Sequence, residues 1–256
     1  KNFFILTSLL ISGATYAAEA SNNIAVVNTD KIKNNTKAGQ SIAKQLEALE
    51  KAFKEKAASM PRTNLELKAG SYISTQDAIL GLIVHSSNDA AVVLAENIAG
   101  SEANFAKLMN IKAKKLGMNK TAYYNASGWH HKHQKSTAYD LAKLAMAIKN
   151  DFPKFFPWFS ICSFTFNGKT YHSHNHVVRK YPGATGLKTG FTNPSGFNLA
   201  TTATKKEKQL VGVVLGENTA SARDKYMMKL LDKCFKKIDN PAIMQSARLK
   251  HSKNNK

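Results

Sequence analysis

The sequence predicts a mixed α/β fold in which an antiparallel sheet is flanked by helices and a further block of helices forms a lobe of its own. Helical periodicity dominates residues 74–149, short strand-like segments follow between 161 and 216, and an amphipathic helix closes the pattern over 220–238. Strands packed with helices, beside a separate helical block, are typical of this class. The 256 residues, 43% of them hydrophobic, are enough to bury a substantial core.

Residues 1–20 have the order of a secretory signal. Lys1 and Asn2 precede an apolar run, Phe3 to Ile11, and small residues then lead to Ala20. This pattern predicts export across the inner membrane into the periplasm. An uncleaved anchor is the alternative, although a run of about ten apolar residues is short for a membrane span. Contact with the membrane therefore stays open.

Residues 21–58 form a segment of different composition. Over 37–58 the apolar residues recur at helical spacing among Lys, Glu and Gln. This spacing predicts an amphipathic helix that lies on a surface or in a coiled coil. From Ser59 onward the composition is that of a globular domain, which we expect to extend to residue 239, and residues 240–256 form a basic tail of disordered composition.

The helices of the middle block have recognisable starts. Ser74 and Asp77 have the spacing of a capping box before the apolar run 78–84, and a second helix is expected over 89–99. Between the two helices lies a polar corner, residues 86–88. Two further helices are predicted, one capped by Ser101 and ending at Gly117, the other beginning at Thr137 and Asp140 and reaching Lys149.

Strand patterns begin after Pro157. Residues 162–166 and 169–174 flank Asn167-Gly168, a pair that readily adopts the positive φ angles of a tight hairpin. Residues 196–203 and 210–216 are the next two strands, and the charged turn 205–208 joins them. They are expected to be antiparallel neighbours.

Two tripeptides point to chemistry. Serine acyl-transfer enzymes without a His-Asp pair can use an S-x-x-K segment, a Ser-x-Asn corner and a Lys-Thr-Gly strand that face one cleft. The corner Ser86-Ser87-Asn88 and the segment Lys188-Thr189-Gly190 match the last two. Each is weak evidence alone, because Ser86 and Asn88 also suit helix caps and Lys188 also suits a solvated strand.

With their flanks, the two tripeptides resemble the low-molecular-weight D-alanyl-D-alanine carboxypeptidases. The stretches LGLIVHSSNDAAVVLAENIAG, AGSEANFAKLMNIKAKKLGMNKTAYYNASG and PGATGLKTGFTNPSGFNLATTA carry the resemblance, which covers about 59–235. It implies a serine β-lactamase-like, penicillin-binding-protein fold, shortened on its N-terminal side. It also implies removal of the terminal D-alanine from peptidoglycan stem peptides through an acyl-serine intermediate, binding of β-lactam antibiotics, and no metal or organic cofactor.

The resemblance assigns substrate-binding roles to one segment. Lys188 and Thr189 would hold the carboxylate of the terminal D-alanine through charge-assisted contacts. Gly190 would let the backbone approach the substrate closely. The backbone N–H of Phe191 would supply half of the oxyanion hole.

The resemblance also implies catalytic residues. Ser86 would help to pass a proton to the departing amine, and Asn88 would hydrogen-bond the substrate amide. The S-x-x-K of this chain is Ser41 to Lys44, whose two side chains share one helix face, so that a desolvated Lys44 can serve as the base for a nucleophilic Ser41.

The context of Ser41 departs from the family pattern. The charged helix QLEALEKAFKEK follows it, and burial of that helix would leave several charged side chains buried without partners. Residues 22–58 resemble instead the start of the OmpH/Skp family of periplasmic chaperones. Two alternatives to an active enzyme follow, a non-catalytic module that binds wall peptides or penicillin, and a chaperone-like periplasmic protein.

The charge, the histidines and the cysteines limit which partners, metals and disulfides the sequence suggests. The net charge of +20 suits an anionic neighbourhood, but no recognisable nucleic-acid module is present, so no nucleic-acid partner is expected. On a strand, His172, His174 and His176 would share one face, yet no carboxylate or Cys ligand accompanies them and we assign no metal. Cys162 and Cys234 either pair or stay free.

Overall fold

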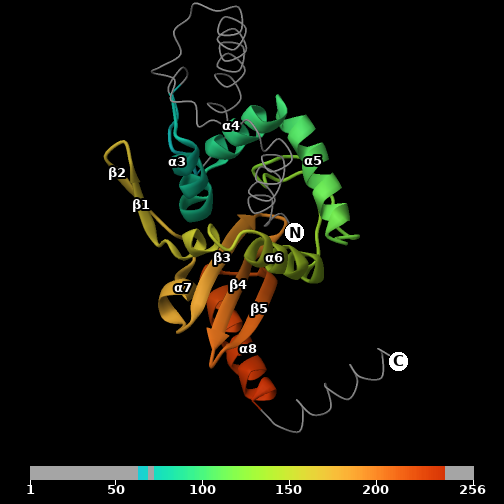
Figure 1. Cartoon of the computed structure of the whole chain (residues 1–256), viewed down its shortest axis with the longest axis vertical. Helices are drawn as coiled ribbons and strands as arrows, with labels where there is room; N and C mark the ends of the chain where they lie inside the picture. Colours follow the sequence, from blue (N-terminus) through green and yellow to red (C-terminus); the bar gives the residue numbers. More distant parts are fainter. Residues whose placement is uncertain (1–62, 69–71, 240–256) are drawn as a thin grey trace, which may run out of the picture.

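The computed structural model describes residues 63–68 and 72–239 (Figure 1). Its centre is an antiparallel sheet in the order β3 (Ala184–Thr192), β4 (Gly196–Lys205) and β5 (Lys208–Glu217). Helix α8 (Ala220–Ile238) runs along this sheet, and α6 (Ala138–Asp151) packs against β4 and β5. The predicted mixed α/β class, with helices flanking an antiparallel sheet, is confirmed.

A helical lobe lies beyond the sheet (Figure 1). It contains α3 (Thr75–Leu80), a π-helical turn η2 (Gly81–His85), α4 (Asn88–Ala99) and α5 (Glu102–Lys115). The predicted caps are present: Ser74 accepts the N–H of Asp77 at 3.0 Å, and Ser101 accepts the N–H of Asn104 at 3.1 Å. These side chains satisfy backbone donors that the first turn of a helix leaves free.

The segment between α6 and the sheet holds a short hairpin. The 3₁₀ turn η3 (Phe156–Ser160) leads into β1 (Ser163–Phe166) and β2 (Lys169–His172), which pair antiparallel. At the turn, Asn167 has φ 47° and Gly168 has φ 74°, as the Asn-Gly pair predicts.

The three alternating histidines do not share one strand face. Strand β2 ends at His172, and His176 is the first residue of α7 (His176–Lys180). His174 lies in the connection between these two elements. A bend and a helix start therefore replace the extended backbone that a common face requires. Among residues 63–68 and 72–239, no three His, Cys, Asp or Glu side chains are grouped closely enough to hold a metal ion.

Two hydrophobic clusters cover opposite faces of the sheet. The larger one joins α6 and the helical lobe to the side of β5 that carries Val213. The smaller one joins α8 to the side of β5 that carries Val214. Neighbouring residues of a strand point to opposite faces, so the sheet is buried on both sides. Burial on both faces keeps water away from polar groups carried by the central part of the sheet.

The predictions for the two ends of the chain concern residues that the structure does not describe. The predicted signal 1–20, the segment 21–58 and the basic tail 240–256 lie outside the described residues. Within the ranges that are described, no helix combines the length and apolar character needed to cross a bilayer. Cys162 and Cys234 are both free thiols.

Candidate active site

The polar corner between η2 and α4 has a strained backbone. Ser86 adopts the left-handed conformation, with φ 64° and ψ 37°. Its N–H donates to Leu82 O at 3.2 Å, and the N–H of Ser87 donates to Gly81 O at 3.1 Å. Residues other than glycine seldom adopt positive φ, and they keep it where surrounding contacts enforce it. The π-helical turn thus fixes the direction in which the Ser86 side chain leaves the backbone.

A buried carboxylate anchors the start of α4. Asp89 accepts the backbone N–H of Leu65 at 3.0 Å and that of Leu67 at 3.3 Å. The N–H of Asn88 donates in turn to Thr63 O at 2.9 Å. Hydrogen bonds to an ionised carboxylate are stronger than neutral ones, and a negative charge is favoured at a helix N-terminus. The corner is therefore tied to the segment 63–68 as well as to its own helices.

Lys188 reaches this corner from β3. Its side chain is among the largest that are fully buried, and its Nζ donates to Ser86 Oγ and, at 3.0 Å, to Thr189 O. Burial, with a smaller contribution from the charge of Arg223, lowers the pKa of Lys188 to about 7. At neutral pH the charged and neutral forms of this amine are consequently about equally populated. Such an amine is suited to exchange a proton with a hydroxyl.

A second cation lies behind Lys188. Arg223, on α8, is buried and donates through Nε and Nη2 to Asp224 Oδ1 at 3.0 and 2.7 Å. Its Nη2 also donates to His174 O at 3.3 Å. Because Asp224 neutralises much of the guanidinium charge, the pair can remain buried while it still disfavours a proton on Lys188.

Two imidazoles complete the surroundings of the corner. The rings of His85 and His174 are 5.8 Å apart between centroids, and His85 is 4.6 Å from the ring of Tyr171. Burial lowers the pKa of His85, and burial together with the charge of Lys188 lowers the pKa of His174 to about 4. Both rings are therefore neutral near pH 7, and they add no positive charge next to Lys188.

The structure brings the two tripeptides together. Ser86 and Lys188 are in contact, and Asn88, the last residue of the corner, is the first residue of α4. The segment predicted to bind a carboxylate lies within β3, where Thr189 is buried and the side chain of Phe191 is 53% exposed. Gly190 separates these two residues in the same strand. Ser41 and Lys44, the predicted nucleophile and base, lie outside the described residues.

Three residues of this site were missed by sequence reasoning. Arg223 is one basic residue in a lysine-rich helix, and His85 precedes the Ser-x-Asn corner without a recognisable pattern. His174 was considered only with its histidine neighbours. No local signal distinguishes these residues, because they come from η2, from the β2–α7 connection and from α8, and only the tertiary fold brings them near Lys188.

A pocket of about 520 Å³ opens beside Phe191, at the edge of the sheet where β3 ends, β4 begins and β5 ends. It is lined by Ser136, Phe191, Asn193, Pro194, Ser195, Gly196, Leu215, Gly216, Glu217 and Asn218.

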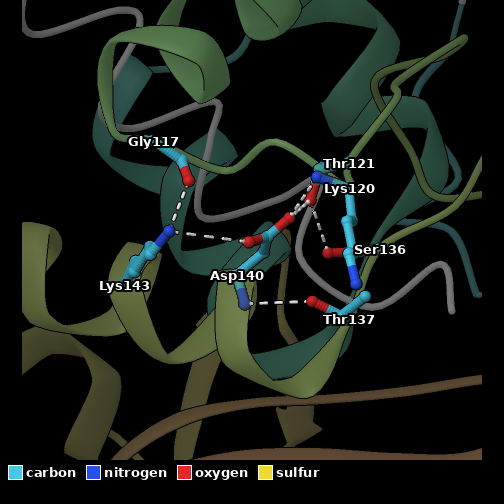
Figure 2. Close-up of polar contacts among 7 residues, drawn as sticks. All are labelled: Gly117, Lys120, Thr121, Ser136, Thr137, Asp140 and Lys143. Atoms are coloured by element: carbon cyan, nitrogen blue, oxygen red, sulfur yellow. Dashed lines mark hydrogen bonds and ion pairs between the residues drawn. The ribbon is translucent and has the colours of Figure 1, made fainter.

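One wall of this pocket is supported by the polar network shown in Figure 2. Asp140 Oδ2 accepts the N–H of Lys120 at 2.9 Å and the hydroxyl of Thr121 at 2.8 Å. The hydroxyls of Thr121 and Ser136 are 2.9 Å apart, and Lys143 lies 3.9 Å from Asp140 Oδ1. The network holds Ser136 in place at the start of α6.

Known proteins resemble this chain over most of its length. The model of the D-alanyl-D-alanine carboxypeptidase family matches residues 16–219. The D-alanyl-D-alanine carboxypeptidase DacD of Escherichia coli K12 is 40% identical over 166 residues, which are 64% of this chain and 43% of that protein. Penicillin-binding protein 6B from Escherichia coli matches with a TM-score of 0.69 and 32% identity, over 89% of this chain and 67% of that one.

A second similar structure contains a β-lactam. Penicillin-binding protein D2 from Listeria monocytogenes, in its ampicillin-bound form, matches with a TM-score of 0.60 and 28% identity, over 72% of this chain and 84% of that one. The chain spans less than half the length of the curated relative from Escherichia coli. The family match runs through residues 22–58, so the expected resemblance of that segment to the OmpH/Skp chaperones is not supported.

Proposed function

Since the chain belongs to the D-alanyl-D-alanine carboxypeptidase family, we propose that it removes the terminal D-alanine from peptidoglycan stem peptides as a serine-type enzyme. The observation that carries the proposal is the contact between Lys188 Nζ and Ser86 Oγ in a buried environment. It joins the Ser-x-Asn corner to the Lys-Thr-Gly strand, and a buried lysine with a pKa of about 7 can both attract a carboxylate and exchange a proton.

In the proposed reaction, β3 orients the substrate. The carboxylate of the terminal D-alanine binds Lys188 and the hydroxyl of Thr189, and the carbonyl of the scissile bond accepts the N–H of Phe191. Gly190 has no side chain to obstruct the approach of the peptide to the strand. Asn88 hydrogen-bonds the substrate amide from the other side.

The covalent steps use Ser41 and Lys44. Ser41 Oγ attacks the scissile carbonyl and loses its proton to Lys44, and the leaving amine of D-alanine gains a proton through Ser86. Water then attacks the resulting ester, which releases the shortened peptide and restores the Ser41 hydroxyl. This segment is proposed because it is the S-x-x-K of the sequence and lies within the stretch matched by the family model. The signal pattern at 1–20 supports the further proposal that the enzyme acts in the periplasm.

The test is intact-mass spectrometry after incubation with benzylpenicillin, because β-lactams acylate the nucleophile of such a site. The expected result is a mass increase equal to that of the drug, which Ser41→Ala abolishes. Ser86→Ala is expected to slow acylation by about 10²-fold or more, since it removes a group that transfers protons. Ser87→Ala, the matched control, removes a buried hydroxyl one residue away that makes no hydrogen bond within the described residues.

Each outcome separates the alternatives. An adduct that persists in Ser41→Ala would assign the nucleophile to another residue. A folded protein that binds a D-alanyl-D-alanine peptide but forms no adduct would be a non-catalytic binding module. A protein that neither binds the peptide nor forms an adduct would refute the proposed function.

A further inference from the structure

Helix α8 presents a row of lysines to solvent. Four exposed lysines follow one another at four-residue spacing, and we call them the lysine row: Lys225, Lys229, Lys233 and Lys237. Residues four apart on a helix lie one above the other on the same face, so the row extends along about 18 Å of α8. The four side chains therefore leave the helix from one narrow strip of its surface.

The opposite face of α8 is buried against the sheet. Met227, Leu231 and Phe235 have the same four-residue spacing and belong to the smaller hydrophobic cluster. They are offset from the lysine row by two residues, which is about 200° around the helix axis. Among the residues of α8, all of which are described, Tyr226 is the one large hydrophobic side chain that is exposed. The apolar face that an interfacial helix inserts into a bilayer is thus already occupied within the protein.

The carboxylates near the lysine row do not neutralise it. Within residues 63–68 and 72–239, none of its four lysines forms an ion pair. The three carboxylates of residues 220–239 have other partners: Asp224 accepts from Arg223, Asp232 accepts the hydroxyl of Tyr181 at 2.9 Å, and Asp239 pairs with Lys208 at 2.7 Å. The ammonium groups of the row therefore remain available to an external anion.

Further positive charge surrounds the C-terminal end of α8. Lys208 donates to Ile238 O at 2.9 Å, which holds the β4–β5 turn against this end of the helix. The turn carries the exposed Lys205 and Lys206. A hydrogen bond from Lys208 lowers the pKa of Asp239, and the charges of Lys206 and Lys205 lower it further. The lysine row thus ends in a region of positive potential.

We propose that the lysine row binds a linear polyanion whose repeating charges are phosphate groups. A lysine ammonium binds phosphate as a point charge on a flexible stem, so a row of lysines accepts the successive phosphates of a chain in many orientations. Each phosphate that is neutralised releases counterions, and this release favours binding. Tyr226 is a single ring, which is too little for the stacking of successive bases, so a chain without bases fits better than a nucleic acid.

The position of the lysine row separates it from the candidate active site. Arg223, which lies behind Lys188, belongs to the buried face of α8, and the row lies on the opposite face. A chain bound to the row would retain the protein in an anionic matrix while the cleft beside β3 stays accessible. The inference does not rest on the proposed function, because binding is measured without a peptide substrate.

The experiment is a calorimetric titration of the full chain with linear inorganic polyphosphate at two NaCl concentrations. Orthophosphate at an equal concentration of phosphate is the monomeric comparison. The row variant replaces Lys225, Lys229 and Lys233 by glutamine. The matched control has the same net charge, because it replaces by glutamine three exposed lysines of α5: Lys107, Lys114 and Lys115. Glutamine is a good helix former, so both variants should keep the Tm of the wild type in circular dichroism.

The expected results follow from the number of contacts. With four contacts, the wild type and the control should lose about 50-fold in affinity for polyphosphate between about 50 and 200 mM NaCl. The row variant keeps one lysine of the row, so it should lose only about threefold over the same range. At the lower salt concentration it should bind at least about tenfold more weakly than the control. Orthophosphate should not compete, because it makes only one contact.

Four outcomes would overturn the inference. A row variant with the affinity and salt dependence of the control would assign binding to the overall charge or to the basic segment 240–256. Loss of binding after replacement of the same three lysines by arginine would show that charge is not what the row supplies. Tighter binding of a single-stranded oligonucleotide than of polyphosphate would indicate base contacts. Binding of phosphatidylglycerol vesicles that requires the row, without binding of polyphosphate, would assign the row to a membrane surface.

Discussion

Replacement of Lys188 by methionine tests whether burial lowers the pKa of this amine. Methionine keeps a side chain of similar length but cannot ionise. In the unfolded chain a lysine loses its proton near pH 10.5, whereas in the folded protein Lys188 loses it near pH 7. Between these values the unfolded state binds nearly one proton more, so the free energy of unfolding of the wild type rises with pH. The stabilisation is complete above about pH 10.5 and is lost as the pH falls through 7.

The size of this pH dependence follows from a difference of one bound proton between the unfolded and folded states. Each pH unit within the window contributes about 1.4 kcal/mol, so the wild type should gain about 2 to 3 kcal/mol between pH 7.5 and 9.5 relative to Lys188→Met. Loss of the contact with Ser86 shifts the stability of the variant by an amount that does not depend on pH. The difference in slope therefore isolates the ionisation of Lys188 from the loss of its hydrogen bond.

The assay is urea unfolding at pH 7.5, 8.5 and 9.5, followed by tryptophan fluorescence. Lys205→Met is the control, because Lys205 is an exposed lysine on the neighbouring strand. This control should keep the slope of the wild type. If wild type and Lys188→Met have parallel pH profiles, the Lys188 amine titrates as an ordinary lysine, and the argument for proton exchange with Ser86 fails.

Two further substitutions test the scaffold around the site. Asp89→Asn places an NH₂ group among backbone donors such as the N–H of Leu65, and it should lower the free energy of unfolding by about 2 to 3 kcal/mol in urea titrations; a change below about 0.5 kcal/mol would contradict the assigned anchor. Gly183→Ala adds a Cβ that would lie 2.1 Å from Thr204 O at a residue with φ +84°, so we expect a loss of about 2 kcal/mol or more and a lower Tm, and an unchanged Tm would show that the turn accepts a side chain.

Local patterns predicted the helices and hairpins because their determinants lie within a few residues. Ser74, Ser101 and Thr137 cap the expected helices, and Asn167-Gly168 forms the expected turn. The continuous helix predicted over 78–84 instead changes to a π-helical turn at Gly81, since the preference for one hydrogen-bond pattern over the other is set by packing around the corner rather than by composition.

Strand β3 shows where local patterns fail. The strand ranges predicted from local patterns did not include residues 184–192, which form β3 and contain the Lys-Thr-Gly segment. Two glycines and a lysine interrupt the alternation that identifies strands, and burial on both faces removes it further. Ser86 and Lys188 were predicted from their motifs alone, whereas the contribution of Arg223 depends on the tertiary position of α8.

The contact between Ser86 and Lys188 joins residues that are 102 positions apart in the chain. During synthesis the corner is made first, and it has no partner until β3 has followed. The second cation, on α8, is added later still. Contacts of such long sequence separation form late, because a large loop must close before they contribute any stability. The site should therefore be among the last parts of the domain to form, and an incomplete chain would carry the serine corner without the buried amine that it contacts in the finished fold.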